Sequence, residues 1–476
     1  MIFKRFHEPK LSQYSYLLGC PASGEALVVD PNRDIDRYLQ AAAEERLRIA
    51  HVTETHIHAD FVSGSRELAH RTGARLYLSD AGGSDWRYEY APDGGATLVR
   101  DGSCFRVGAV EVRVMHVAGH TPEHLALLVT DTETASEPMG ALTGDFIFVG
   151  DVGRPDLLER AVRAKGTMEE GARQLHRSLQ RFRSLPDYLQ IWPGHGAGSA
   201  CGKSLGAVPQ STLGYEKRFN WAFGVADETA FVREVVAGQP DPPRYFAEMK
   251  RINRSGPRLL GAIRRPARLP VGTLISVLAQ GRTVVDTRDA AGFARGAVPG
   301  TINIPANRTF TTWAGSLLAY DRDFHLIVDD RQAQTVDELV RDLAGIGLDR
   351  LEGYFGNEVV DAWRMAKDQL QTIPSLGLAE VTARYRSNEM VVVDVRGEGE
   401  WNAGHIAGSL NLPLGDLEQR LDEVPRNRTL IVHCQTGARA AMAASLLRAR
   451  GFLDVRVFTG GFAEWRVAGL PVEPTA

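Results

Sequence analysis

Short apolar runs separated by glycine-rich turns fill the first half of the chain. Runs such as GEALVVD, ARLYLS, VEVRVMHV and HLALLVT have the length of strands, and few helix-like stretches lie between them. We therefore expect a domain rich in β-strands over residues 1–250. Residues 251–269, which are rich in Pro, Gly and Arg and lack clear periodicity, are predicted to form a linker.

After the linker the pattern changes, because apolar strands now alternate with helix-like stretches. The segments VVDTRDAAGFARGAVPGTINIP (284–305) and VVDVRGEGEWNAGHIAGSLNLP (392–413) align without a gap at an offset of 108 residues. This offset is too long for a solenoid repeat and indicates a duplicated domain. The βα alternation is typical of a parallel sheet, so we predict tandem α/β domains at 270–370 and 375–476.

Length, charge and cysteine content limit the number of domains and the classes of partner that we expect. A chain of 476 residues is too long for one hydrophobic core. Its 55 basic and 59 acidic residues nearly balance, without a basic run, so we expect neither nucleic acid nor membrane as a partner. Neither a secretory leader nor an apolar span of membrane length is found, which predicts a cytoplasmic protein. The four scattered cysteines do not form a disulfide framework.

Histidines and aspartates follow several predicted strands of the first domain. A single such histidine is more often a hydrogen-bonded core or surface residue, but recurrence at several strand ends predicts a metal site. The stretches are THIHADFVSG, VAGHTPEH, LTGDFIF and IWPGHGAG. They contain the candidate residues His56, His58, Asp60, His120, Asp145 and His195.

The order T-H-x-H-x-D, A-G-H-T, T-G-D, P-G-H resembles the motif order of the metallo-β-lactamase fold, over about half the chain. In hydrolytic members such as the glyoxalase II group, the first motif ends in a further histidine that helps to hold a second metal. This sequence has Phe61 there, and a phenyl ring offers no lone pair. We therefore expect one metal ion.

One metal held by two histidines and a carboxylate is the facial triad of non-haem Fe(II) oxygenases. The stretch TGDFIFVGDVGRPDLL also resembles the persulfide dioxygenases, a branch of this fold. That resemblance implies one Fe(II) per chain, bound by His56, His120 and Asp145. It further implies that ligands and bound water are oriented by His58, Asp60 and His195.

The stretch HCQTGAR, residues 433–439, carries a second kind of chemistry. Cys434 follows an apolar strand, and the loop N–H groups, the start of a helix and Arg439 favour a thiolate there. A lone cysteine is more often an inert core thiol. With VVDVR, GHIAGSLNLP and FTGGFAEW around it, however, this domain closely resembles a rhodanese, in which that cysteine carries a persulfide. The loop is one residue shorter than in phosphatases of the same fold.

Two other positions bear on sulfur chemistry. In the first copy, HLIVDDRQAQT aligns with TLIVHCQTGAR and puts Asp329 and Asp330 in place of the histidine and cysteine, which predicts a catalytically silent rhodanese-like domain. Cys201 follows His195 by six residues. It is interpreted either as a structural thiol or as a possible relay of sulfane sulfur.

Together these patterns predict a multidomain α/β protein, an αββα metallo-β-lactamase fold followed by two rhodanese-like domains, and resemble persulfide dioxygenase-sulfurtransferase fusions. The resemblance implies oxidation of a low-molecular-weight thiol persulfide by O2 to sulfite. Sulfane-sulfur transfer to sulfite would then give thiosulfate, in sulfide detoxification. We expect a homo-oligomer. The alternatives are a glyoxalase II-like thioester hydrolase fused to a sulfur carrier, against which Phe61 counts, and a non-catalytic sulfur sensor.

Overall fold

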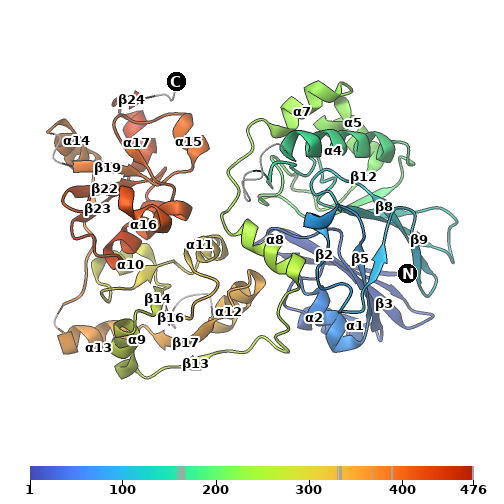
Figure 1. Cartoon of the computed structure of the whole chain (residues 1–476), viewed down its shortest axis with the longest axis horizontal. Helices are drawn as coiled ribbons and strands as arrows, with labels where there is room; N and C mark the ends of the chain where they lie inside the picture. Colours follow the sequence, from blue (N-terminus) through green and yellow to red (C-terminus); the bar gives the residue numbers. More distant parts are fainter. Residues whose placement is uncertain are drawn as a thin grey trace. The chain divides into compact units, whose positions relative to one another are not determined.

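The computed structural model describes residues 1–157, 159, 167–329, 331, 335–367, 369–387 and 390–473. The chain divides into two compact units (Figure 1): Met1–Ile263 with Ala344–Gly347, and Arg264–Leu343 with Leu348–Ala476. Within the described ranges, every helix is too short or too polar to traverse a lipid bilayer.

Two six-stranded sheets form the first unit, with strand orders β1-β2-β3-β4-β5-β6 and β12-β11-β10-β9-β8-β7. The strands are β1 (Ile2–Glu8), β2 (Gln13–Cys20), β3 (Glu25–Val29), β4 (Arg48–Thr53), β5 (Arg75–Ser79), β6 (Thr97–Val99), β7 (Cys104–Val107), β8 (Val110–His116), β9 (Leu125–Asp131), β10 (Gly140–Gly144), β11 (Gln190–Pro193) and β12 (Ser211–Thr212). The helices described here are α1 (Asp36–Glu44), α2 (Ser65–Thr72), η1 (Ser84–Trp86), α4 (Thr167–Arg183), α5 (Leu213–Phe219), α6 (Trp221–Gly224), α7 (Glu228–Val236) and α8 (Phe246–Ser255).

Side chains point alternately to the two faces of each strand, so each sheet packs against the other sheet on one face and against helices on the other. In β9, Leu125 and Leu127 pack between the two sheets, in a core shared with β2 and β3. Ala126 and Leu128 point the other way, into a second core with α4 and α7. A third core lies between the first sheet and α1. Because successive residues of a strand face opposite sides, buried strands of this kind give the predicted αββα sandwich.

The second unit contains two five-stranded parallel sheets, ordered β13-β17-β16-β14-β15 and β18-β23-β22-β19-β21. The first has β13 (Ala267–Arg268), β14 (Thr283–Asp286), β15 (Ile302–Asn303), β16 (Phe324–Val328) and β17 (Leu351–Gly356). The second has β18 (Ser375–Leu376), β19 (Met390–Asp394), β21 (Leu410–Asn411), β22 (Thr429–His433) and β23 (Val455–Phe458). A separate small sheet pairs β20 (His405–Ile406) with β24 (Val472–Glu473).

Helices follow the strands of both sheets. Those of the first repeat (270–370) are η2 (Val271–Thr273), α9 (Leu274–Ala279), α10 (Ala290–Arg295), α11 (Phe310–Leu317), α12 (Val336–Gly345) and α13 (Glu358–Lys367). Those of the second repeat (375–476) are α14 (Leu378–Arg386), α15 (Glu398–Asn402), η3 (Leu414–Gln419), η4 (Leu421–Glu423), α16 (Ala438–Ala449) and α17 (Gly461–Val467). When the strands are paired in chain order (β13 with β18, β14 with β19, β15 with β21, β16 with β22 and β17 with β23), the two sheets have the same strand order. This is expected for a duplication.

Candidate functional site

The candidate metal ligands lie in loops that leave buried strands of the first unit. His56 follows β4, His120 follows β8 and Asp145 follows β10, and all three side chains are buried. Gly144, directly before Asp145, has a φ of +48°, and a Cβ there would lie 2.5 Å from Oγ1 of Thr55. Only glycine fits this conformation and this spacing, so it allows the carboxylate to reach the two histidines.

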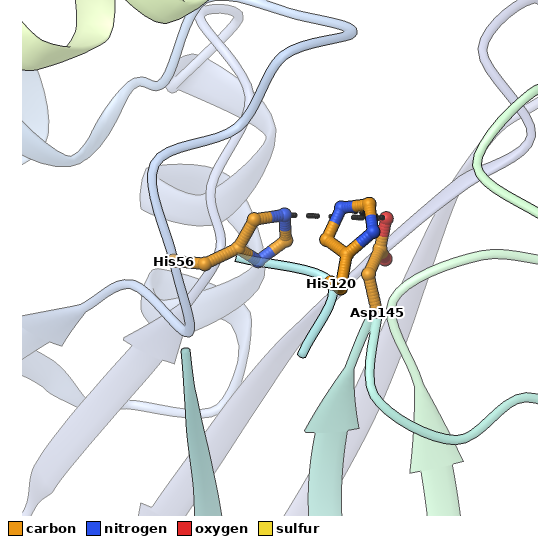
Figure 2. Close-up of side chains that lie close together, drawn as sticks. All are labelled: His56, His120 and Asp145. Carbon is orange, nitrogen blue, oxygen red and sulfur yellow. Dashed lines mark ion pairs between the residues drawn. The ribbon is translucent and has the colours of Figure 1, made fainter. Parts of the chain in front are cut away.

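Figure 2 shows His56, His120 and Asp145 converging on one point. Oδ2 of Asp145 lies 3.5 Å from Nε2 of His120 and 4.0 Å from Nε2 of His56. The three potential ligand atoms lie within 4.8 Å of one another. The structure thus brings together the three residues predicted to bind the metal.

Both histidines have the form that a metal requires. Nδ1 of His120 lies 2.9 Å from the carbonyl oxygen of Arg154, which can only accept, so the proton is on Nδ1 and Nε2 keeps its lone pair. Nδ1 of His56 contacts Oγ1 of Thr55 at 2.9 Å, and this contact fixes the ring. Burial lowers the pKa of both histidines, so both imidazoles are neutral at pH 7.

The Asp145 carboxylate has one satisfied and one unsatisfied oxygen. Nδ1 of His195 donates to Oδ1 at 2.7 Å, while the buried Oδ2 has no hydrogen-bond partner among the described residues. Burial raises the pKa of Asp145, but the charge and hydrogen bond of His195 outweigh it and hold that pKa below its usual range. A buried anionic oxygen without a partner is costly. A cation between Oδ2 and the two imidazoles would remove that cost, so the residues fit a divalent metal.

His195 links Asp145 to a second cluster. Its Nε2 lies 2.8 Å from Oδ2 of Asp60. Burial lowers the pKa of His195, but the two carboxylates raise it well above the usual value, so the ring is a cation between two anions. Ligand atoms of Asp60, His195 and Cys201 also lie within 4.8 Å of one another. Burial raises the pKa of the Cys201 thiol well above its usual value, and the carboxylates add to the effect.

His58 does not join either cluster. Its Nε2 lies 3.1 Å from Oδ1 of Asp30, and the ring of Phe61 packs against it with 4.3 Å between centroids. Burial lowers the pKa of His58, but the charge and hydrogen bond of Asp30 outweigh it and raise that pKa to about 9. His58 is therefore a cation committed to Asp30, and the fully buried Phe61 fills the space beside it.

Two residues of the metal region escaped the sequence analysis. Asp30 accepts hydrogen bonds from the backbone N–H and the hydroxyl of Thr55, at 2.7 and 2.9 Å, and so positions the loop before His56. His124 stacks on His56 at 4.6 Å and accepts the backbone N–H of Asp145 at 3.0 Å. Each carried a weak signal, since Asp30 ends an apolar run and His124 lies in the same motif as His120.

The predicted sulfur-transfer loop, residues 433–439, connects β22 to α16. Cys434 is buried, and the N–H of Gly437 donates to its Sγ at 3.1 Å. Gly437 has a φ of +98°, which a side chain would strain. The guanidinium of Arg439 forms a two-point ion pair with Glu400, with Nη2 2.8 Å from Oε1. The sequence analysis missed Glu400, which fixes the arginine.

The matching loop of the first repeat is only partly described. Asp329 receives hydrogen bonds from the backbone N–H and side chain of Arg331, with Nη2 2.9 Å from Oδ2. Asp330, which the alignment places opposite Cys434, lies outside the described residues. The silence of this repeat therefore stays a prediction based on residue type.

Two family models match the chain. That of the metallo-beta-lactamase superfamily covers residues 9–195, and that of the rhodanese-like domain covers residues 378–468. The first range ends at His195, and the second contains the whole sulfur-transfer loop. The rhodanese-like match lies in the second repeat, so a rhodanese-like first repeat stays a prediction.

Known proteins are similar to parts of the chain of different length. A metallo-beta-lactamase structure from Staphylococcus aureus subsp. aureus COL is 41% identical, with a TM-score of 0.66, over 75% of this chain and 99% of that one. The persulfide dioxygenase ETHE1 of Bos taurus mitochondria is 28% identical, over 41% of this chain and 68% of its own length. The hydroxyacylglutathione hydrolase of Methylococcus capsulatus is 31% identical, over 38% of this chain and 61% of its own length. Several curated relatives are matched over only 60 to 61% of their length.

Proposed function

Because this chain belongs to the metallo-beta-lactamase superfamily and carries a rhodanese-like domain behind that fold, we propose that it oxidises persulfides and transfers sulfane sulfur. The first unit would be a non-haem Fe(II) persulfide dioxygenase. The second repeat would be a sulfurtransferase that makes thiosulfate from sulfite. The substrates are a low-molecular-weight thiol persulfide, O2 and sulfite, and the physiological role is sulfide detoxification.

One observation carries the iron assignment: the ligand atoms of two histidines and one carboxylate converge within 4.8 Å of one another. A metal on His56, His120 and Asp145 has only three protein ligands, which leaves positions for two small molecules. His58 contributes no ligand atom to this cluster; its Nε2 is paired with Asp30, and its buried Nδ1 has no hydrogen-bond partner among the described residues. Similarity to a persulfide dioxygenase supports the same choice.

The overall reaction balances as R–S–SH + O2 + H2O → R–SH + sulfite + 2 H⁺. Fe(II), when bound, would supply the electrons that activate O2 and a position for the terminal sulfur. The neutral rings of His56 and His120 hold their Nε2 lone pairs toward the metal position. His195, held between Asp60 and Asp145, orients the carboxylate and offers a nearby proton. Burial of all these groups excludes bulk water.

The sulfur-transfer step uses the second repeat. Sγ of Cys434 attacks the terminal sulfur of a second persulfide anion, R–S–S⁻, and the S–S bond breaks to release R–S⁻. Sulfite then attacks the outer sulfur of Cys434–S–S⁻, and thiosulfate leaves with the Cys434 thiolate restored. The N–H of Gly437 stabilises negative charge on the sulfur, and Arg439, held by Glu400, would offer its remaining N–H groups to the sulfite oxygens.

Cys201 is the weaker candidate carrier. It is buried beside Asp60 and His195, which suits a relay next to the metal. Its raised pKa keeps it protonated at neutral pH, however, and a protonated thiol is a poor nucleophile. We therefore assign the transferable sulfur to Cys434.

A thioester hydrolase is the second candidate function. The cluster of Asp60, His195 and Cys201 could hold a second metal, as a hydrolytic two-metal centre requires. Similarity to a hydroxyacylglutathione hydrolase points the same way. That reaction consumes no O2, so oxygen uptake separates the two functions.

Two variants of the Fe(II)-loaded full chain test the proposal. His120→Ala removes a ligand and should abolish O2 uptake with a persulfide and most of the bound iron, while thiosulfate-dependent sulfur transfer continues. Cys434→Ser replaces the sulfur carrier and should leave O2 uptake intact, with sulfite accumulating instead of thiosulfate. An oxygen electrode, iron analysis and chromatography of derivatised sulfur products provide the measurements.

Other outcomes would contradict the proposal. Hydrolysis of a glutathione thioester without O2 uptake, with two metal ions per chain, would favour the hydrolase. Normal thiosulfate formation by Cys434→Ser would instead make Cys201 the carrier.

A further inference from the structure

A cavity of about 430 Å³ opens in the second unit between the two repeats. The second repeat supplies Arg439 and Met442, so the cavity begins at the end of the sulfur-transfer loop. The first repeat supplies most of the other lining, including Asp289, Asn307 and Trp313. The predicted silent repeat therefore forms a wall beside the predicted active loop.

A buried hydrogen bond joins the two repeats, between residues close in sequence to the cavity lining. The backbone N–H of Asn303 at the end of β15 donates to Oγ of Ser445 in α16 at 2.8 Å, and both groups are buried. Because α16 also begins at the sulfur-transfer loop, the same helix fixes the loop and the cavity wall. The cavity belongs to the pair of repeats, and neither repeat could form it alone.

The lining suits a small organic molecule with a positive group. Pro305, Trp313 and Met442 give it an apolar part. One carboxylate oxygen of Asp289 caps α10 through the N–H of Gly292 at 2.8 Å, and no ion pair to this carboxylate is found among the described residues. The charge of Arg439 is already matched by Glu400. Asp289 is exposed at the cavity and is the one acidic residue of its lining, which also contains the aromatic ring of Trp313, and such a lining favours an ammonium group.

We propose that this cavity binds the organic part of the persulfide that loads Cys434, and that it prefers persulfides with a protonated amine. This rests on the sulfur-transfer function proposed above. The apolar part of R would lie against Trp313 and its ammonium group near Asp289, with the terminal sulfur directed to the loop. The first repeat would then select the sulfur donor, although its own loop has no cysteine.

The test compares three sulfur donors on the full chain under anaerobic conditions, so that no O2 is available to the metal site. Cysteamine persulfide carries an ammonium group, 3-mercaptopropionate persulfide carries a carboxylate, and thiosulfate has no organic part. Transfer from each donor through Cys434 to cyanide is followed by thiocyanate formation. Trp313→Ala should raise KM about tenfold for both organic persulfides and leave kinetics with thiosulfate unchanged.

Asp289→Asn keeps a cap for α10 but removes the charge. It should lower kcat/KM about threefold for the cysteamine persulfide and raise it for the anionic one, again without effect on thiosulfate. Met365→Ala is the matched control, since this side chain of the first repeat is 89% exposed and lies outside the cavity lining.

The outcomes separate the two proposals. Equal KM values for wild type and Trp313→Ala with every donor would overturn the cavity assignment and leave sulfur transfer intact. Failure of wild type to transfer sulfur even from thiosulfate would overturn the sulfur-transfer function itself. Parallel losses with all three donors would mean that Trp313 only supports the fold, and would also overturn the cavity assignment.

Discussion

The two repeats of the second unit keep the same scaffold around different loops. In the first, Arg288 pairs with Asp286, with Nη2 2.6 Å from Oδ2. In the second, Arg396 pairs with Asp394 at the same distance. The V-V-D-x-R motif that marks the duplication is thus a buried structural element in both copies, and by itself says nothing about catalysis.

An asparagine completes this scaffold in both repeats. Nδ2 of Asn303 donates to the carbonyl oxygens of Asp286 and Arg288, both at 2.9 Å. Asn411 makes the equivalent bonds in the second repeat, at 3.2 and 3.0 Å. In both repeats the asparagine therefore stabilises the turn that follows the V-V-D-x-R strand.

Chemistry diverges where the scaffold ends. At the offset of 108 residues, Gly292 stands where the second repeat has Glu400, so an arginine in the first loop would lack its ion-pair partner. In the loop alignment, Asp330 and Thr335 take the places of Cys434 and Arg439. The two repeats thus share the residues of the core and differ in the loop residues on which the proposed sulfur transfer depends.

The largest effect is expected from moving the cysteine between the repeats. Cys434→Ser should lower sulfur transfer at least about a thousandfold, because a hydroxyl cannot carry sulfane sulfur. Adding Asp330→Cys to that variant should restore nothing, since Thr335 and Gly292 supply neither the arginine nor its partner. Thiocyanate formation from thiosulfate measures the rate. Any recovery in the double variant would mean that the cysteine alone separates the repeats.

A smaller effect tests the shared scaffold. Asp394→Asn and Asp286→Asn each leave a largely buried arginine without its carboxylate, which costs about 3 kcal/mol of unfolding free energy. The cost should be somewhat lower for Asp286→Asn, because the Arg288 side chain is 13% exposed against 2% for Arg396. Urea unfolding of the full chain gives the free energies.

Asp361→Asn serves as the control for this pair, because its carboxylate is 76% exposed and its removal should cost almost nothing. If only one of the two scaffold variants were destabilised, the repeats would not share the structural role assigned to the motif.

The smallest effect concerns the partner of Arg439. Glu400→Gln keeps the shape of the side chain but removes the charge that fixes the guanidinium, which should lower sulfur transfer to sulfite about tenfold. The change should appear mainly in KM for sulfite, because Arg439 would still be present but no longer held in place. Steady-state kinetics with varied sulfite provides the measurement, and an unchanged KM with a lower kcat would contradict this role.

The sequence indicated a residue of the site when the signal lay in its own motif. It did not indicate a residue whose role depends on a partner far away in the chain. His56, His120 and Asp145 were candidates because each lies in its own motif after an apolar strand, and the resemblance to persulfide dioxygenases selected them from six such residues. The role of His58 could not be derived in this way, since its partner Asp30 is 28 residues earlier and the pair follows no periodic spacing.

The αββα sandwich was implied by the resemblance to the metallo-β-lactamase fold, and the duplication was predicted from the internal alignment at an offset of 108 residues. The sheet orders agree with both. The cavity beside Arg439 escaped prediction for a different reason. It forms only where two separately folded sheets meet, and no sequence pattern reports how Trp313 and Met442 come to line the same space.

Asp30 ties two histidines of the metal region to one carboxylate. It pairs with Nε2 of His58 and accepts two hydrogen bonds from Thr55, the residue before His56. A change at Asp30 would therefore disturb the orientation of both rings at once, although Asp30 is none of the three residues of the metal cluster. Any change in the metal chemistry of this loop, including Phe61→His, would act on histidines whose positions are already set from 28 residues earlier in the chain.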